Sequence, residues 1–235
     1  MEYILIIVIS IIFLLILKYA WNIKIKDIKK LKEIGYDKNL NEIANKLPEN
    51  KEICKAILKK LHNENVKIQE NEDKDNKTSL YIAISNTIFI ANIKDTFTRV
   101  QTIAHECLHS IQNRRTLLFN FIFSNLYFLY FIVVCILTIL KMNPFPMLSL
   151  WGLAFFSAIY YAIRSYLEMD AMTKAKTLTK EYLAEEGSLT KEEQQIILEN
   201  LERINEIGIK LTNFSLLLNC TIKMMILAII LYIFI

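Results

Sequence analysis

The chain has 235 residues, of which 54% are hydrophobic and 22% are charged, and its formal net charge is +4. A mean hydropathy of +0.31 requires a very large core or a membrane, and the low glycine and proline content excludes collagen and turn-rich β-sandwiches. The weak charge, without a basic patch among aromatic residues, argues against nucleic acid as a partner. Four scattered cysteines without C-x-x-C spacing are expected to be reduced thiols. We therefore expect a mainly α, multi-pass helical membrane protein with a smaller α+β part in water.

Four segments are long and apolar enough to span a bilayer, which takes about 20 helical residues. They are Tyr3 to about Ala20, Leu117 to Leu140, about Pro146 to Ile163, and about Phe214 to Ile235. The first has no basic region before it and no small-residue cleavage site, so we expect a retained anchor. The last is interrupted by Lys223, which either faces the interior of a helix bundle or precedes a shorter membrane segment.

The placement of lysine and arginine predicts the orientation in the cell membrane. Lysines are dense between Lys18 and Lys32, Arg114 and Arg115 precede the second segment, and only Lys141 lies between the second and third. This pattern predicts that both termini are outside and that both polar regions are cytoplasmic. The expected organisation is an N-terminal anchor (1–21), a cytoplasmic α+β region (22–116), a transmembrane hairpin (117–163), a cytoplasmic helical region (164–212) and a C-terminal membrane segment (213–235).

The first polar region has mixed patterns. Apolar residues between Ile53 and Leu61 have helical spacing, which predicts a helix. The alternation from Leu80 to Ile84 predicts a half-buried strand, and Thr87–Ile90 predicts a second strand. The polar stretch from Glu70 to Lys77 is expected to be a loop.

The second polar region is predicted to form two helices. Gly187 is a suitable end for the first, because glycine tolerates the left-handed backbone that often terminates a helix. Thr190 and Glu193 have the spacing of a capping box, which predicts the start of the second.

The residues that indicate chemistry are His105-Glu106-Cys107-Leu108-His109, an H-E-x-x-H motif. Residues four apart on an α-helix are rotated by about 40°, so both imidazoles can reach one metal ion, and zinc readily takes neutral imidazole nitrogen. Glu106 projects to the side where a catalytic water would lie. An apolar stripe from Val100 to Ile111 predicts an amphipathic helix that packs on a core and presents the two histidines to a cleft.

A metallohydrolase needs a third protein ligand, and the predicted hairpin suggests where it lies. The ends of the hairpin return to the same side of the membrane, so His109 and Glu168 are both about 7 to 12 Å from its boundary. Glu168 and Asp170 are therefore the candidates. Being two residues apart on a helix, they point in nearly opposite directions, so both are not expected to bind one metal.

Two stretches resemble the YugP-like family of membrane-bound neutral zinc metallopeptidases. His105 to Gln112 is similar to that family's H-E-x-G-H-x-x-Q motif, and Glu168 to Ala175 is similar to its E-x-D-A-S-x-x-A stretch. Thr87 to Asn92 is similar to its T-I-x-L-S strand. Leu108 and Met172 depart from the pattern, because the family has a glycine and a small hydroxyl residue there.

The resemblance implies a zinc ion held by His105, His109 and Glu168, with Asp170 as a supporting or structural residue. By its position after the hairpin, Asp170 stays the alternative ligand. With Glu106 as the catalytic base, the expected function is hydrolysis of peptide bonds near the cytoplasmic membrane face, in peptide or membrane-protein substrates. Four residues are candidates for a substrate-aligning strand, or for a purely structural one: Thr87, Ile88, Phe89 and Ile90.

The alternative is a catalytically inactive, metallopeptidase-like scaffold that binds membrane-protein partners. An intramembrane protease is disfavoured because the motif lies outside the apolar segments. A zinc carrier is disfavoured because these segments hold no histidine and only Glu2 at one edge. The sequence does not indicate an oligomeric state.

Overall fold

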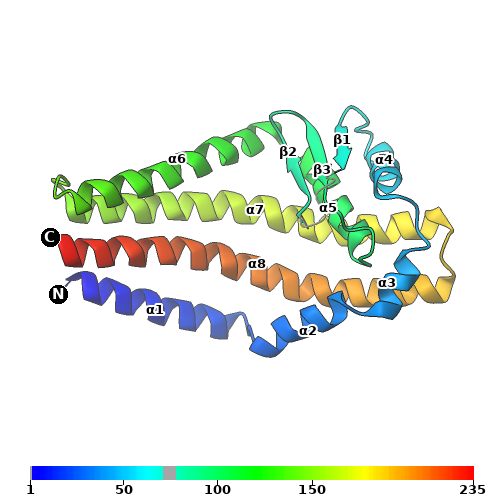
Figure 1. The fold of residues 1–235 in the computed structure, drawn as a ribbon, viewed down its shortest axis with the longest axis horizontal. Coiled ribbons are helices and arrows are strands. Elements are labelled where there is room, and N and C mark those ends of the chain that lie inside the picture. The colour runs from blue at the N-terminus through cyan, green and yellow to red at the C-terminus, as the bar shows by residue number, and fades with distance from the viewer. Residues whose placement is uncertain (1, 71–77) are drawn as a thin grey trace. The chain divides into compact units, whose positions relative to one another are not determined.

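The computed structural model describes residues 2–70 and 78–235, which are mostly helical and include one small sheet (Figure 1). The chain divides into two compact units. The first comprises Met1–Lys24, Leu118–Tyr166 and Lys210–Ile235, and the second comprises Ile25–Leu117 and Leu167–Ile209. The two predicted polar regions therefore contribute to one unit. Residues 71–77 of the expected loop lie outside the described residues.

Four helices are long and apolar enough to cross a membrane, as the sequence predicts. They are α1 (Glu2–Ala20), α6 (Arg114–Ile139), α7 (Pro146–Glu186) and α8 (Lys191–Phe234). Helices α7 and α8 each continue without a break through an apolar stretch and a polar stretch. The predicted third segment and the helix after it are therefore one helix, since no glycine or proline follows Gly152 before Gly187.

Lys223 lies within α8 and contacts the core of the first unit. Its ammonium is 4.6 Å from the centroid of the Tyr127 ring and donates a hydrogen bond of 2.7 Å to Oδ1 of Asn219. The Tyr127 hydroxyl is bonded in turn to the hydroxyl of Ser157 at 2.8 Å. Lys223 therefore faces the neighbouring helices of the first unit.

The second unit combines short helices with a three-stranded sheet. Its elements before α6 are α2 (Ile25–Gly35), α3 (Lys38–Ala44), α4 (Asn50–Lys60), β1 (Lys67–Glu70), β2 (Leu80–Ile82), β3 (Thr87–Ile90) and α5 (Arg99–Ile111). The predictions of α4, β3 and α5 are confirmed. Strand β1 was not predicted, because its polar and largely exposed residues lack the alternation of a half-buried strand.

The strand order is β1-β3-β2, with β1 parallel and β2 antiparallel to β3. The predicted strand from Leu80 to Ile84 is too long, because β2 ends at Ile82 and Ile84 is exposed. The chain must turn after Ile82 to bring β3 alongside, and Asn86 completes this turn with a φ of +49°.

The connection between α7 and α8 has the predicted end and start signals. Gly187 follows the last residue of α7 with a φ of +83°, a conformation that costs glycine little. The Glu193 amide donates to Oγ1 of Thr190 at 3.3 Å, and the Thr190 amide donates to Oε2 of Glu193 at 3.1 Å. These reciprocal bonds confirm the capping box.

Arg99, the first residue of α5, connects this helix to the segment between α3 and α4. Its guanidinium is fully buried and donates to the carbonyl oxygens of Ala44, Leu47 and Pro48, each at 2.8 Å, and to Oδ1 of Asn50 at 3.1 Å. These bonds give buried donors to the carbonyls of Leu47 and Pro48, which follow α3, and a second donor to the carbonyl of Ala44 at its end. The start of the helix that carries the histidines is thereby fixed.

We expect Arg99→Met to lower the free energy of unfolding by about 3 kcal/mol, because several buried acceptors would lose their donor. Chemical unfolding in detergent, followed by circular dichroism, measures this change. The exposed Arg115→Met is the control, with an expected change below about 0.5 kcal/mol. Equal stability of the two variants would contradict the role of Arg99.

Candidate metal site

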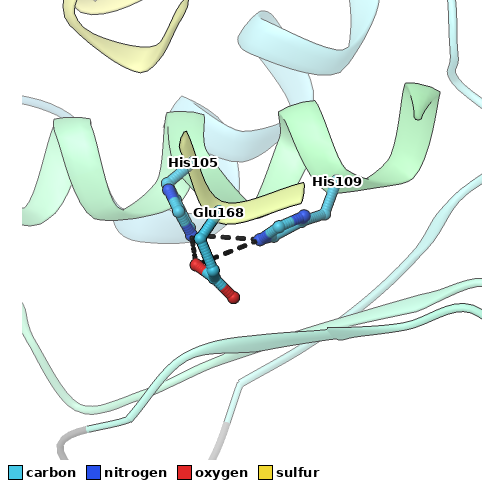
Figure 2. Close-up of side chains that lie close together, drawn as sticks. All are labelled: His105, His109 and Glu168. Atoms are coloured by element: carbon cyan, nitrogen blue, oxygen red, sulfur yellow. Dashed lines mark hydrogen bonds and ion pairs between the residues drawn. The ribbon is translucent and has the colours of Figure 1, made fainter. Parts of the chain in front are cut away.

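Helices α5 and α7 bring together the three residues that the sequence suggests as metal ligands (Figure 2). The Nε2 atoms of His105 and His109 are 3.1 Å apart. Oε2 of Glu168 is 3.3 Å from Nε2 of His105 and 3.8 Å from Nε2 of His109. The two histidine nitrogens come from one turn of α5, and the carboxylate oxygen comes from α7. All three atoms converge on one point.

The geometry and the donor chemistry of this group fit a zinc ion. In a tetrahedral site with ligands at about 2.0 to 2.1 Å, neighbouring ligand atoms are about 3.3 Å apart, close to the observed separations. Two imidazoles and a carboxylate form one of the ligand sets of catalytic zinc. Burial would lower the pKa of His109, but its contacts with Glu168 and Gln112 outweigh burial and raise that pKa. The contacts with Glu168 and Gln112 therefore stabilise positive charge at His109.

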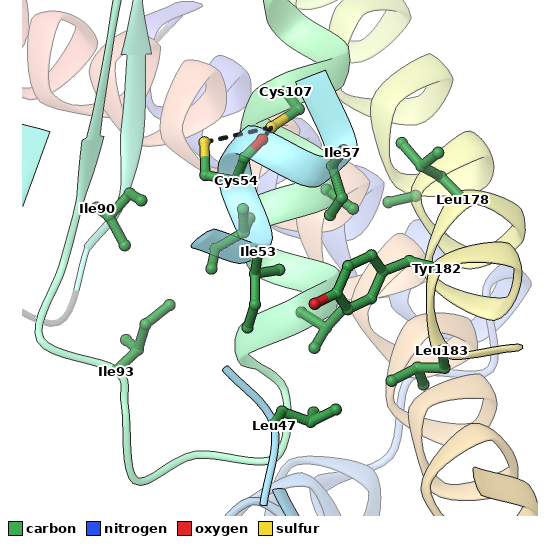
Figure 3. Packing of buried hydrophobic residues seen from close by; sticks show 14 of the residues in the cluster. Leu47, Ile53, Cys54, Ile57, Ile90, Ile93, Cys107, Leu178, Tyr182 and Leu183 are labelled. Carbon is green, nitrogen blue, oxygen red and sulfur yellow. Dashed lines mark hydrogen bonds between the residues drawn. The ribbon is translucent and has the colours of Figure 1, made fainter. Parts of the chain in front are cut away.

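The opposite face of α5 is part of the core of the second unit (Figure 3). All members of the predicted apolar stripe are buried except Ile111, which is exposed at the last residue of the helix. Cys107 contacts Cys54 across this core, with their sulfur atoms 3.6 Å apart, and burial raises the pKa of the Cys107 thiol. Leu108 is also buried there. The helix thus packs through one face and holds the histidines with the other.

Glu106 lies between the two histidines in the sequence and is fixed by the sheet. Its Oε2 accepts a hydrogen bond of 2.7 Å from the backbone amide of Tyr81 in β2. Burial raises the pKa of Glu106, while the neighbouring histidines and this amide act against the rise. A raised carboxyl pKa is suitable for a group that exchanges protons. The role of Tyr81 was not predicted, because a backbone amide leaves no signature in the side-chain pattern.

A chain of hydrogen bonds supports His109 from the side away from Glu168. Nδ1 of His109 is 2.8 Å from Oε1 of Gln112, whose Nε2 donates to Oδ2 of Asp170 at 3.0 Å and to the carbonyl of Leu167 at 2.8 Å. Lys174 donates to Asp170 at 2.5 Å. Asp170 therefore contacts Gln112 and Lys174 and is not part of the group of three ligand atoms. With Gln112 accepting from Nδ1, Nε2 of His109 is available as a ligand.

The strand that was expected to align a peptide substrate, β3, has no free edge in the sheet. β3, formed by Thr87, Ile88, Phe89 and Ile90, is the central strand and pairs with β1 on one edge and β2 on the other. An extended peptide cannot add to β3 without displacing one of them, which corrects the expectation of β-addition there. Partner choice within a sheet depends on distant residues, so the local pattern could not predict this position.

Comparisons of the chain with models of protein families, with curated proteins and with solved structures find no match. The H-E-x-x-H motif and the geometry around it are therefore the features that indicate a function. In that geometry His105, His109 and Glu168 converge, and Glu106 is adjacent to them in the sequence. Gln112 and the Tyr81 amide complete the surroundings of the group.

Proposed function

We propose that this protein is a membrane-bound, zinc-dependent metallopeptidase. The observation that carries the proposal is the convergence of three ligand atoms, from His105, His109 and Glu168, within 4.8 Å of one another. Two of these residues come from an H-E-x-x-H motif, and the third comes from a separate helix. The resemblance to the YugP-like family is consistent with the same ligand set and activity.

In this mechanism the chain positions a water molecule and moves its proton. Bound zinc would supply Lewis acidity, which makes water a stronger nucleophile and polarises the carbonyl of the scissile peptide bond. Glu106 accepts the proton from the attacking water and passes it to the leaving amine. The Tyr81 amide holds one oxygen of Glu106 in place, and Gln112 keeps the His109 ring in orientation.

The membrane placement is part of the proposal. Four helices have the length and hydropathy to cross a bilayer, and lysines are dense between Lys18 and Lys32, after the first of them. By the positive-inside rule, the second unit would be cytoplasmic and both termini would be outside. Peptide bonds near the cytoplasmic membrane face would then be the substrates.

The sheet suggests where a peptide substrate would align. β2 is an outer strand, and the amide of its central residue, Tyr81, contacts Glu106. In the described part of the chain, no further strand pairs with the outer edge of β2. We therefore assign substrate alignment to the neighbourhood of β2 instead of β3.

Removal of metal tests the proposal. Purified protein in detergent is incubated with a peptide library prepared from whole-cell protein, and new peptide ends are identified by mass spectrometry. We expect new ends with the wild-type protein, their loss after treatment with 1,10-phenanthroline, and their return when zinc is added. Cleavage that is equally efficient in chelator-treated protein would contradict a metal-dependent mechanism.

A further inference from the structure

A cavity of about 430 Å³ lies between α4 and β1, two elements of the second unit that contact each other (Figure 1). This volume is within the range of ligand sites, about 300 to 1,000 Å³. Its apolar wall includes Leu58 of α4, Val66 and Ile68 of β1. The charged residues in its lining, all exposed, are Lys51, Lys55, Lys59 and Glu64. None of the lining residues belongs to the proposed metal site.

The cavity lies beside an open strand edge. β1 is an outer strand, and no strand in the described part of the chain pairs with its far side. The Lys67 amide points toward β3, because it donates to the carbonyl of Asn86 at 3.0 Å. Successive residues of a strand direct their backbone groups to opposite edges, so the amide and carbonyl of Ile68 face outward. Since Ile68 also lines the cavity, the open edge and the cavity belong to one surface.

The charge of this surface is positive. Lys51, Lys55 and Lys59 are four residues apart, which places them on one side of α4. Among residues 2–70 and 78–235, none of the three has an ion-pair partner, and Glu64 is the one carboxylate in the lining. Neighbouring lysines are about 6 Å apart along the helix axis. Side chains on one face of an extended peptide recur every ~6.6 Å, which is a similar step.

From these observations we infer that the surface between α4 and β1 docks an extended acidic segment of a partner protein. The segment adds to the outer edge of β1, where its backbone bonds to the amide and carbonyl of Ile68. Carboxylates on alternate residues of the segment contact the lysines of α4. A basic segment is excluded by the same charges. The inference does not depend on the proposed peptidase activity, because it uses none of the residues assigned to that activity.

A labelled peptide of alternating glutamate and threonine, six residues long, is the probe. Its binding to the full-length protein in detergent is followed by fluorescence anisotropy. We expect saturable binding that weakens as salt is added, because the contacts are between exposed charges. The corresponding peptide of alternating lysine and threonine should not bind. Absence of saturable binding by the acidic peptide would overturn the inference.

A second peptide separates strand addition from simple attraction between charges. It has the same sequence, but alternate backbone amides carry a methyl group and cannot donate to β1. Two such peptides, methylated at odd or at even positions, cover both registers. We expect at least one of them to bind about tenfold more weakly than the parent peptide. Equal affinity of all three peptides would show binding by charge alone and overturn the docking of an extended segment.

A charge reversal locates the docking surface. Lys55→Glu should weaken binding of the acidic peptide about tenfold, because it replaces an attraction by a repulsion in the middle of the three lysines. Lys38→Glu is the matched control, since Lys38 is an exposed residue of α3 outside the cavity and the change in net charge is the same. Both variants should keep the wild-type melting temperature. Equal affinity of the two variants would place the binding elsewhere and overturn the inference.

Discussion

Glu106→Gln is expected to abolish most peptide hydrolysis while zinc binding is retained. The amide of glutamine cannot take a proton from the attacking water, and general-base catalysis of this kind contributes about 10²- to 10⁴-fold to the rate. The change should not disturb the fold, because the glutamine oxygen can still accept the bond that the Tyr81 amide donates to Glu106. The rate of peptide-library cleavage and the zinc content of the same sample are the two measurements.

A matched control separates the loss of a proton acceptor from a general effect of charge. Glu206 is an exposed glutamate of α8, and Glu206→Gln should leave both the rate and the zinc content unchanged. Unimpaired cleavage by Glu106→Gln would contradict the proposed mechanism. Loss of zinc in this variant would instead assign Glu106 to metal binding.

Glu168→Ala is expected to have the largest effect on metal binding. It removes the one ligand that α7 supplies and leaves only the two imidazoles of α5. We expect the zinc affinity to fall by more than about 100-fold, beyond the range typical for residues that only support a ligand. Competition with a chromogenic zinc chelator measures the affinity in detergent.

Asp170→Asn provides the comparison, since the sequence alone left two carboxylates as candidates for the third ligand. In the structure Asp170 contacts Gln112 and Lys174, so its effect on zinc should reach only about 10- to 100-fold. The reverse order of the two effects would exchange the roles of Glu168 and Asp170.

Much of the candidate site could be predicted because its features are local in the sequence. The spacing of His105 and His109 places both imidazoles on one face of α5, and the stripe of apolar residues indicates the opposite face. Glu168 could be suggested because the predicted hairpin returns the chain to the same side. The capping box of Thr190 and Glu193 was predictable for the same reason, since its two partners are three residues apart.

Features that depend on distant partners could not be predicted. The central position of β3 follows from which strands pair with it, and β1 has too few apolar residues to be recognised. The bond from the Tyr81 amide to Glu106 joins a backbone group to a residue on another element. The four carbonyl and amide acceptors of Arg99 likewise come from a segment about 50 residues away.

The zinc content of the wild-type protein, purified in detergent without added metal, is the most direct test of the central claim. Elemental analysis by mass spectrometry, normalised to protein concentration, gives the number of zinc atoms per chain. The convergence of His105, His109 and Glu168 predicts about one zinc per chain. Folded protein that contains no zinc, and takes up none when zinc is supplied, would contradict a metal site and with it the proposed peptidase.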